Sequence, residues 1–102
     1  MKKIFISQSE KDILENILSG DFEVLLFGSR VKGDHQKFSD LDICIKGKSR
    51  LSRDALANFR LQLSDSALPY TVDLIDYNAI DESFRKLIDA HSANILQTKA
   101  VN

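Results

Sequence analysis

The strongest structural signal in this chain lies in two neighbouring segments, Phe27-Gly28-Ser29-Arg30-Val31-Lys32-Gly33 and Phe38-Ser39-Asp40-Leu41-Asp42-Ile43. The first follows Val24-Leu25-Leu26, a short apolar run without polar alternation, which indicates a strand covered on both faces. In the second, apolar residues alternate with polar ones through Ile45, and this period of two predicts a strand with its carboxylates on one face. The two segments therefore predict one strand that ends in a Gly-Ser turn and another that displays a pair of carboxylates.

Length and composition restrict the class of protein. The 102 residues predict a single domain, and 43% hydrophobic residues with one Pro and four Gly are typical of a globular protein. A net charge of -1 lacks the basic excess of nucleic-acid binders, so no direct nucleic-acid binding is expected. The single cysteine, Cys44, excludes an internal disulfide. The apolar run Ile4-Phe5-Ile6 is too short for a signal peptide, and no run reaches membrane-spanning length, so we expect a cytoplasmic protein without membrane contact.

Apolar spacing and capping residues predict the remaining elements. Ser9, with Asp12 three residues later, predicts the start of a first helix that ends before Gly20. A second helix is predicted from about 52 to 64, followed by a third strand over 70–76. Asp81 is the predicted cap of a last helix, and residues 92–102 either extend that helix or fray.

The Gly-Ser turn has a chemical interpretation. Gly28 lets the backbone approach a ligand closely, while the Ser29 hydroxyl and the N–H groups of a following helical turn can bind phosphate oxygens. Gly33 would let the turn finish. Taken alone, however, a Gly-Ser pair is also typical of an ordinary structural turn.

The two aspartates point to a metal. Asp40 and Asp42 project from the same face of a strand, where they can share divalent cations, and oxygen ligands of this kind suit Mg²⁺ or Mn²⁺. The alternative is an exposed turn at Ser39-Asp40, with Asp42 solvated on an edge strand. That alternative is weakened because Asp42 lies between Leu41 and Ile43, where an uncompensated carboxylate is unfavourable.

The combined pattern resembles the nucleotidyltransferase superfamily of the DNA polymerase β type, whose signature is Gly-Ser, a short spacer and Asp-x-Asp, with a third carboxylate on a later strand. Asp73, within Val72-Asp73-Leu74, matches that third carboxylate; Asp76 is less favoured because it lies at the exit of the strand. The turn itself is similar to that of the minimal nucleotidyltransferases. It departs at Val31, where alanine is usual, and the second segment departs at Ile43, where leucine is common.

This resemblance implies a fold. We expect a single α+β nucleotidyltransferase-fold domain over residues 1–102, with a small mixed β-sheet and helices covering one face. The carboxylate face would remain open to ligand. Because the end of the first strand and the start of the second must meet at one site, these strands should be antiparallel, while the helical crossover to 70–76 favours a parallel pair.

The resemblance also implies a reaction, the transfer of a nucleoside monophosphate, AMP from ATP in this subfamily, to a hydroxyl. Two Mg²⁺ ions, with Mn²⁺ as an alternative, would be held by the catalytic carboxylates Asp40, Asp42 and Asp73. The expected nucleotide-binding residues are Gly28, Ser29, Arg30 and Ser39. Lys32 and His35 are expected to be solvated, Cys44 to be a buried unreactive thiol, and Tyr70 and Tyr77 to be packing residues.

The expected partner also follows from the resemblance. Minimal nucleotidyltransferases are encoded with a helical HEPN-domain protein, in toxin–antitoxin pairs where the transferase neutralises a ribonuclease toxin by adding AMP to it. Two alternatives stay open: a nucleotide-binding module with a vestigial site that masks its partner, and a transferase acting on a small molecule or RNA, which the small size and near-neutral charge disfavour. The last helix carries the apolar residues Phe84, Leu87 and Ile88, which either pack on the chain's own sheet or form a surface suited to a helical partner or a homo-oligomer.

Overall fold

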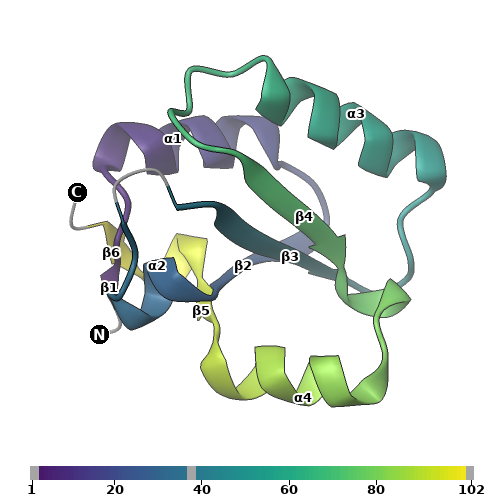
Figure 1. Ribbon diagram of the computed structural model, residues 1–102. Coiled ribbons are helices and arrows are strands. Elements are labelled where there is room, and N and C mark those ends of the chain that lie inside the picture. Colours follow the sequence, from purple (N-terminus) through teal and green to yellow (C-terminus); the bar gives the residue numbers. More distant parts are fainter. Residues whose placement is uncertain (1–2, 37–38, 101–102) are drawn as a thin grey trace.

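A computed structural model describes residues 3–36 and 39–100 and shows a mixed α+β domain (Figure 1). A four-stranded sheet has the order β4-β3-β2-β5, and a separate two-stranded sheet pairs β1 with β6. The elements are β1 (Lys3–Ile4), α1 (Gln8–Ile17), β2 (Phe22–Phe27), α2 (Ser29–Lys32), β3 (Leu41–Gly47), α3 (Arg53–Ser64), β4 (Val72–Asp76), η1 (Tyr77–Ala79), α4 (Glu82–His91), β5 (Ala93–Asn94), η2 (Ile95–Gln97) and β6 (Lys99–Ala100).

The pairing of the central strands confirms the predicted topology. Strand β2 runs antiparallel to β3, and β3 runs parallel to β4. The register places Asp42 directly between Phe27 on β2 and Asp73 on β4. The end of β2 and the starts of β3 and β4 therefore meet at one edge of the sheet.

Helices lie on both faces of the sheet, whereas the sequence predicted helices on one face (Figure 1). Helices α1 and α3 cover the face of the main core, which includes Leu14, Leu26 and Ile43. Helix α4 packs on the other face, where Ile88 meets Leu25 and Cys44. The alternation in β3 did not reveal this second layer, because that face carries both the apolar contacts of α4 and, further along β3 and β4, the carboxylates.

The first helix begins earlier than the predicted start at Ser9. Its N-cap is Ser7, whose hydroxyl accepts from Glu10 N at 3.1 Å while Ser7 N donates to Glu10 Oε1 at 2.8 Å. The Ser-x-x-Glu pattern forms this reciprocal capping box, because the glutamate side chain reaches back to the cap. The prediction from Ser9 and Asp12 was therefore wrong by two residues, although the predicted cap at Asp81 is confirmed, since it accepts from Phe84 N at 2.8 Å.

The segment after α4 neither extends the helix nor frays over its described part, which ends at residue 100. Strand β5 pairs with Leu25 and Leu26 of β2, and β6 pairs with β1. Ala93 and Ile95 become buried against the core. Burying these side chains removes apolar surface from water, which an exposed continuation of α4 would not do. Residues 101–102 of this prediction lie outside the described residues.

Candidate nucleotide-transfer site

Three candidate residues come together at the edge where β2 ends and β3 and β4 begin. Asp42 and Asp73 are partners in the parallel ladder, and Asp40 lies just before β3. Neighbouring strands are about 4.8 Å apart, so the carboxylates of a directly paired residue couple stand side by side on one face. The strand register thus sets Asp42 beside Asp73, with Asp40 in the segment that leads into β3.

Gly28 places the turn against these carboxylates. Its φ of 78° lies in the left-handed region, which disfavours a side chain. A Cβ at this position would also collide with Asp42 Oδ2 and lie 3.3 Å from Asp42 Cγ. Both the conformation and the space therefore require glycine, and the Gly-Ser turn adjoins Asp42 directly.

A short helix continues from the turn. In α2, Val31 N and Lys32 N each donate to Gly28 O at 3.2 Å, and the helix ends at Gly33, whose N–H donates to Ser29 O at 2.8 Å. The N–H group of the first residue of a helix, here Ser29, has no acceptor within the helix. Ser29 therefore starts the helix one residue from Gly28, with its hydroxyl and main-chain N–H suited to anionic oxygens.

The electrostatics of the site are those of crowded like charges. Burial raises the pKa of Asp42, and the neighbouring carboxylates of Asp73 and then Asp40 raise it further. Across residues 3–36 and 39–100, no Lys or Arg forms an ion pair with any of the three. A bound cation would relieve this repulsion and lower the pKa of Asp42 again.

The donor set fits a hard divalent cation that also contacts a substrate. Among the described residues, no three side chains of the ligand-forming types gather closely enough to hold a metal ion by themselves. Mg²⁺ is usually held by one or two carboxylates, with phosphate oxygens and water completing its shell. Asp42 and Asp73, beside a turn suited to phosphate, provide that kind of incomplete set.

Arg30 and Ser39, the two other expected nucleotide-binding residues, have hydrogen-bond partners within the chain. Arg30 is buried, donates to Phe5 O and Ser39 O at 3.2 Å each, and lies 4.5 Å from the centre of the Tyr70 ring. The Ser39 hydroxyl accepts from Gln36 N at 2.8 Å. Both side chains thus organise the connection between the two motifs, a role that no sequence pattern distinguished from phosphate binding.

Two other residues behave as the sequence predicted. Asp76 is buried and accepts from Leu51 N at 2.7 Å and Asn78 N at 3.0 Å, which is a structural role at the strand exit. Cys44 is fully buried, and burial together with the Asp76 charge raises the pKa of its thiol to about 12. A thiol with that pKa is an unreactive core residue at neutral pH.

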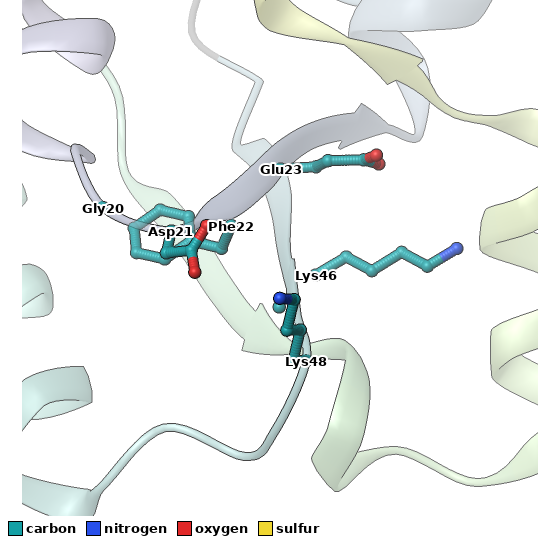
Figure 2. Close-up of a pocket in the computed structure, with 7 residues that line it drawn as sticks. Gly20, Asp21, Phe22, Glu23, Lys46 and Lys48 are labelled. Atoms are coloured by element: carbon teal, nitrogen blue, oxygen red, sulfur yellow. The ribbon is translucent and has the colours of Figure 1, made fainter.

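The volumes of the surface hollows do not single out the candidate site. A hollow of about 470 Å³ lies at the far end of β2 and β3, between Gly20–Glu23 and Lys46–Lys48 (Figure 2). A hollow of about 90 Å³ adjoins the Gly-Ser turn and is lined by Phe27, Gly28, Lys32, Leu87 and His91. The carboxylates and the turn, rather than the size of a hollow, therefore mark the candidate site.

The fold, with carboxylates beside a Gly-Ser turn where β2 ends and β3 and β4 begin, defines a nucleotidyltransferase. Residues 8–100 match the family described as polymerase beta, nucleotidyltransferase, and the chain belongs to this family. The chain is 45% identical over 80 residues to the probable protein adenylyltransferase MntA of Haemophilus influenzae (strain ATCC 51907 / DSM 11121 / KW20 / Rd). That match covers 76% of this chain and 68% of the relative.

Solved structures share the fold. A crystal structure of a toxin–antitoxin with AMP-PNP superposes with a TM-score of 0.69 at 23% identity, covering 86% of this chain and 72% of that chain. A structure of a tri-AMPylated Shewanella oneidensis HEPN toxin with its MNT antitoxin gives a TM-score of 0.67 at 20% identity, covering 88% and 71%. Among the described residues of this chain, no helix has the length and apolarity needed to cross a membrane.

Proposed function

We propose that this nucleotidyltransferase is a protein adenylyltransferase, which transfers AMP from ATP to a hydroxyl of a HEPN-domain toxin and thereby acts as its antitoxin. The observation that carries the proposal is the pairing of Asp42 with Asp73 directly beside Gly28. This arrangement combines a phosphate-binding turn with the carboxylates needed for a divalent cation. The 45% identity to a probable protein adenylyltransferase supports a protein acceptor.

In this mechanism, Gly28 lets the triphosphate approach the main chain, and Ser29 donates its hydroxyl and N–H to the β- and γ-phosphate oxygens. The acceptor oxygen bonds to the α-phosphorus, the bond from that phosphorus to the β-phosphate oxygen breaks, pyrophosphate leaves, and the hydroxyl proton passes to water. Asp40, Asp42 and Asp73 would hold two Mg²⁺ ions, or Mn²⁺ in their place. When bound, these ions would lower the pKa of the acceptor hydroxyl and neutralise the leaving phosphates.

The partner would dock beside this edge. Phe84 and Leu87 of α4 are 36% and 52% exposed, and Phe84 contacts Phe27 edge-to-face at 5.8 Å. Phe27 precedes Gly28, so this apolar surface leads to the turn. A helical protein that covers it would bring an acceptor hydroxyl to the carboxylates. Ile88, by contrast, is fully buried and belongs to the chain's own core.

We also assign residues 1–102 to one minimal nucleotidyltransferase domain and place it in the cytoplasm, where the single thiol of Cys44 would stay reduced.

The test is an incubation of the purified chain with α-labelled ATP, Mg²⁺ and the HEPN-domain protein of the same host. We expect label on the HEPN protein, loss of label with chelator, and none with Asp42→Asn. A stable complex without label would instead identify a masking module with a vestigial nucleotide site. Label on a small molecule or RNA, with the HEPN protein unmodified, would overturn the proposed acceptor.

A further inference from the structure

Arg30 makes the most extensive set of contacts near the site, and the proposed reaction does not use it. Its side chain is 4% exposed, a rare environment for a guanidinium without several acceptors. It donates to the carbonyl oxygens of Phe5 and Ser39 at 3.2 Å each and of Gln36 at 3.5 Å. The main-chain carbonyl of Arg30 accepts from Phe5 N at 2.9 Å, so Arg30 and Phe5 each donate a hydrogen bond to the other's main-chain oxygen.

These contacts reach the segments that carry the candidate site residues. Arg30 itself follows Ser29, and Ser39, whose carbonyl it holds, immediately precedes Asp40. Tyr70, whose ring lies 4.5 Å from the guanidinium carbon, comes three residues before Asp73. One buried side chain, which extends from the helix after the turn, thus contacts Ser39 just before Asp40 and Tyr70 just before β4.

The planar fork of arginine suits this position. Its five N–H donors can bind several carbonyl groups at once while its face stacks on an aromatic ring. A lysine has the same charge but acts as a point donor on a flexible chain, so it cannot hold the same set of carbonyls in fixed relative positions. Tyr70 stays neutral at physiological pH because burial raises its pKa, so its ring remains an uncharged platform.

We propose that Arg30 is a positioning residue for nucleotidyl transfer, which fixes Ser39, and with it the adjacent Asp40, relative to the Gly28-Ser29 turn. This proposal rests on the proposed function. The turn and the carboxylates must bind opposite parts of one metal–triphosphate unit, and small errors in such spacing lower the rate strongly. Arg30 would act by setting that spacing and not by touching the nucleotide.

The test compares Arg30→Lys with Arg60→Gln. Arg60 is a matched control because its guanidinium also donates to a main-chain carbonyl, Leu74 O at 2.9 Å on β4, but it does not contact the segment before Asp40. Both variants would be measured where circular dichroism shows them fully folded. The readouts are the Kd for a non-hydrolysable ATP analogue with Mg²⁺, the kcat of transfer, and hydrogen exchange at two amides, Ser39 and Leu41, which donate to Gln36 O and Thr71 O.

We expect Arg30→Lys to lower kcat at least tenfold, to raise the Kd several-fold, and to speed exchange at Ser39 and Leu41 with the Cys44 amide unchanged. Arg60→Gln should leave all of these within twofold of wild type. A folded Arg30→Lys chain with wild-type kcat, Kd and exchange would overturn the proposal, as would equal effects in both variants.

If Arg30→Lys does not fold, Tyr70→Leu decides, since this variant keeps the guanidinium but removes the aromatic ring. Faster exchange at Ser39 and a raised Kd would support the proposal, and wild-type values of both would overturn it. Absence of transfer in the wild-type chain would instead overturn the proposed function, and the Arg30 proposal with it.

Discussion

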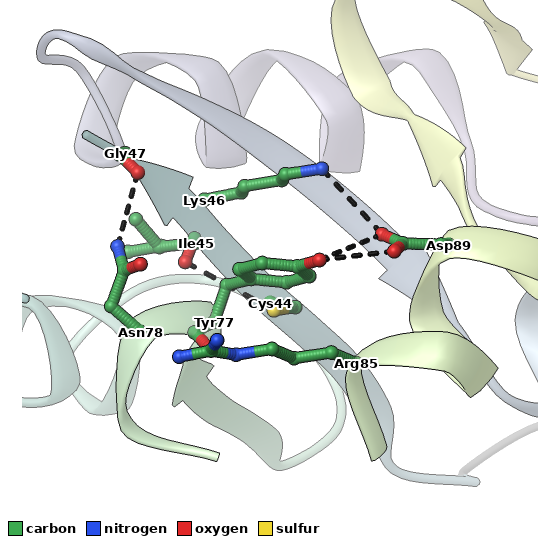
Figure 3. Close-up of polar contacts among 8 residues, drawn as sticks. All are labelled: Cys44, Ile45, Lys46, Gly47, Tyr77, Asn78, Arg85 and Asp89. Atoms are coloured by element: carbon green, nitrogen blue, oxygen red, sulfur yellow. Dashed lines mark hydrogen bonds and ion pairs between the residues drawn. The ribbon is translucent and has the colours of Figure 1, made fainter. Parts of the chain in front are cut away.

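The carboxylates at the two ends of the central sheet have opposite surroundings, at the near end beside the Gly28-Ser29 turn and at the far end where β3 and β4 finish. At the far end, where β3 finishes, Asp89 accepts from the Tyr77 hydroxyl at 3.0 and 3.1 Å and lies 3.5 Å from Lys46 Nζ (Figure 3). Asp76 accepts two main-chain N–H groups there. At the near end, Asp42 meets Asp73 and Asp40, and these two charges add to burial in raising its pKa.

This difference separates stability from function. Hydrogen bonds from N–H and O–H donors satisfy the carboxylates at the far end, so they contribute to the fold. At the near end, like charges converge without a pairing cation among the described residues, which is unfavourable in the free chain. Such arrangements are typical of sites whose ligand supplies the missing charge. The hollow of Figure 2 lies at the far end, so shape alone would have pointed away from the candidate site.

The largest effect is expected from Asp42→Asn. This change should lower transfer at least about 100-fold, because it removes a negatively charged metal ligand at the centre of the cluster. The fold should remain intact, since the variant also removes like-charge repulsion. Transfer assays and thermal unfolding in metal-free buffer would measure both results. Near wild-type turnover would show that the near end is not the active centre.

Asp76→Asn should give the opposite result at the far end. Replacing one carboxylate oxygen by an NH₂ group places a donor against a main-chain N–H of Leu51 or Asn78. We expect a loss of about 1–3 kcal/mol in the free energy of unfolding, typical of a buried polar group left without its partner. Transfer below the unfolding temperature should stay within a few-fold of wild type. A folded but inactive Asp76→Asn would contradict the separation of the two ends.

A matched serine pair sharpens the assignment within the near end. Ser29→Ala should weaken binding of Mg²⁺-ATP by about 1–3 kcal/mol, because it removes a charge-assisted contact to phosphate. Ser39→Ala should affect binding less, since the Gln36 N–H fixes the Ser39 oxygen within the chain and outside the Gly-Ser turn. Isothermal titration calorimetry with and without Mg²⁺ would measure this order. Tight binding that is independent of metal would indicate a different nucleotide site.

The smallest effect concerns pH in the absence of metal. Because the pKa of Asp42 is higher in the folded chain than its ordinary value of 3.8, the folded state binds this proton more tightly. The free energy of unfolding of the wild-type chain should therefore fall relative to that of Asp42→Asn as the pH rises from about 3.8 through the raised pKa. At pH values above the raised pKa, this difference should not grow further. Urea unfolding of both chains between pH 3.5 and 7, at about 1 kcal/mol precision, would test the sign. A difference that stays constant with pH would show that Asp42 is not crowded.

Sequence reasoning reached the main elements of the fold because their signals are local. The apolar run before Gly28 and the alternation through Ile45 indicated β2 and β3, and Asp81 indicated the start of α4. The cap of α1 also has a local signal, Ser7-x-x-Glu10, and the structure shows that this pattern, not Ser9-x-x-Asp12, begins the helix. The two-residue strands β5 and β6 are too short to leave a periodic pattern, so only their pairing partners reveal them.

By itself, the sequence determined the chemical content of the candidate site: a Gly-Ser turn after an apolar strand, and three aspartates of which two share a strand face. Those features depend on residue type and on the fixed period of a strand. Only the tertiary structure decided that Asp73 aligns with Asp42, that α4 covers the carboxylate face beyond them, and that Arg30 is a buried contact of the connecting segments. These outcomes depend on register, helix packing and the acceptors available around a buried charge, which arise from contacts between residues distant in the chain.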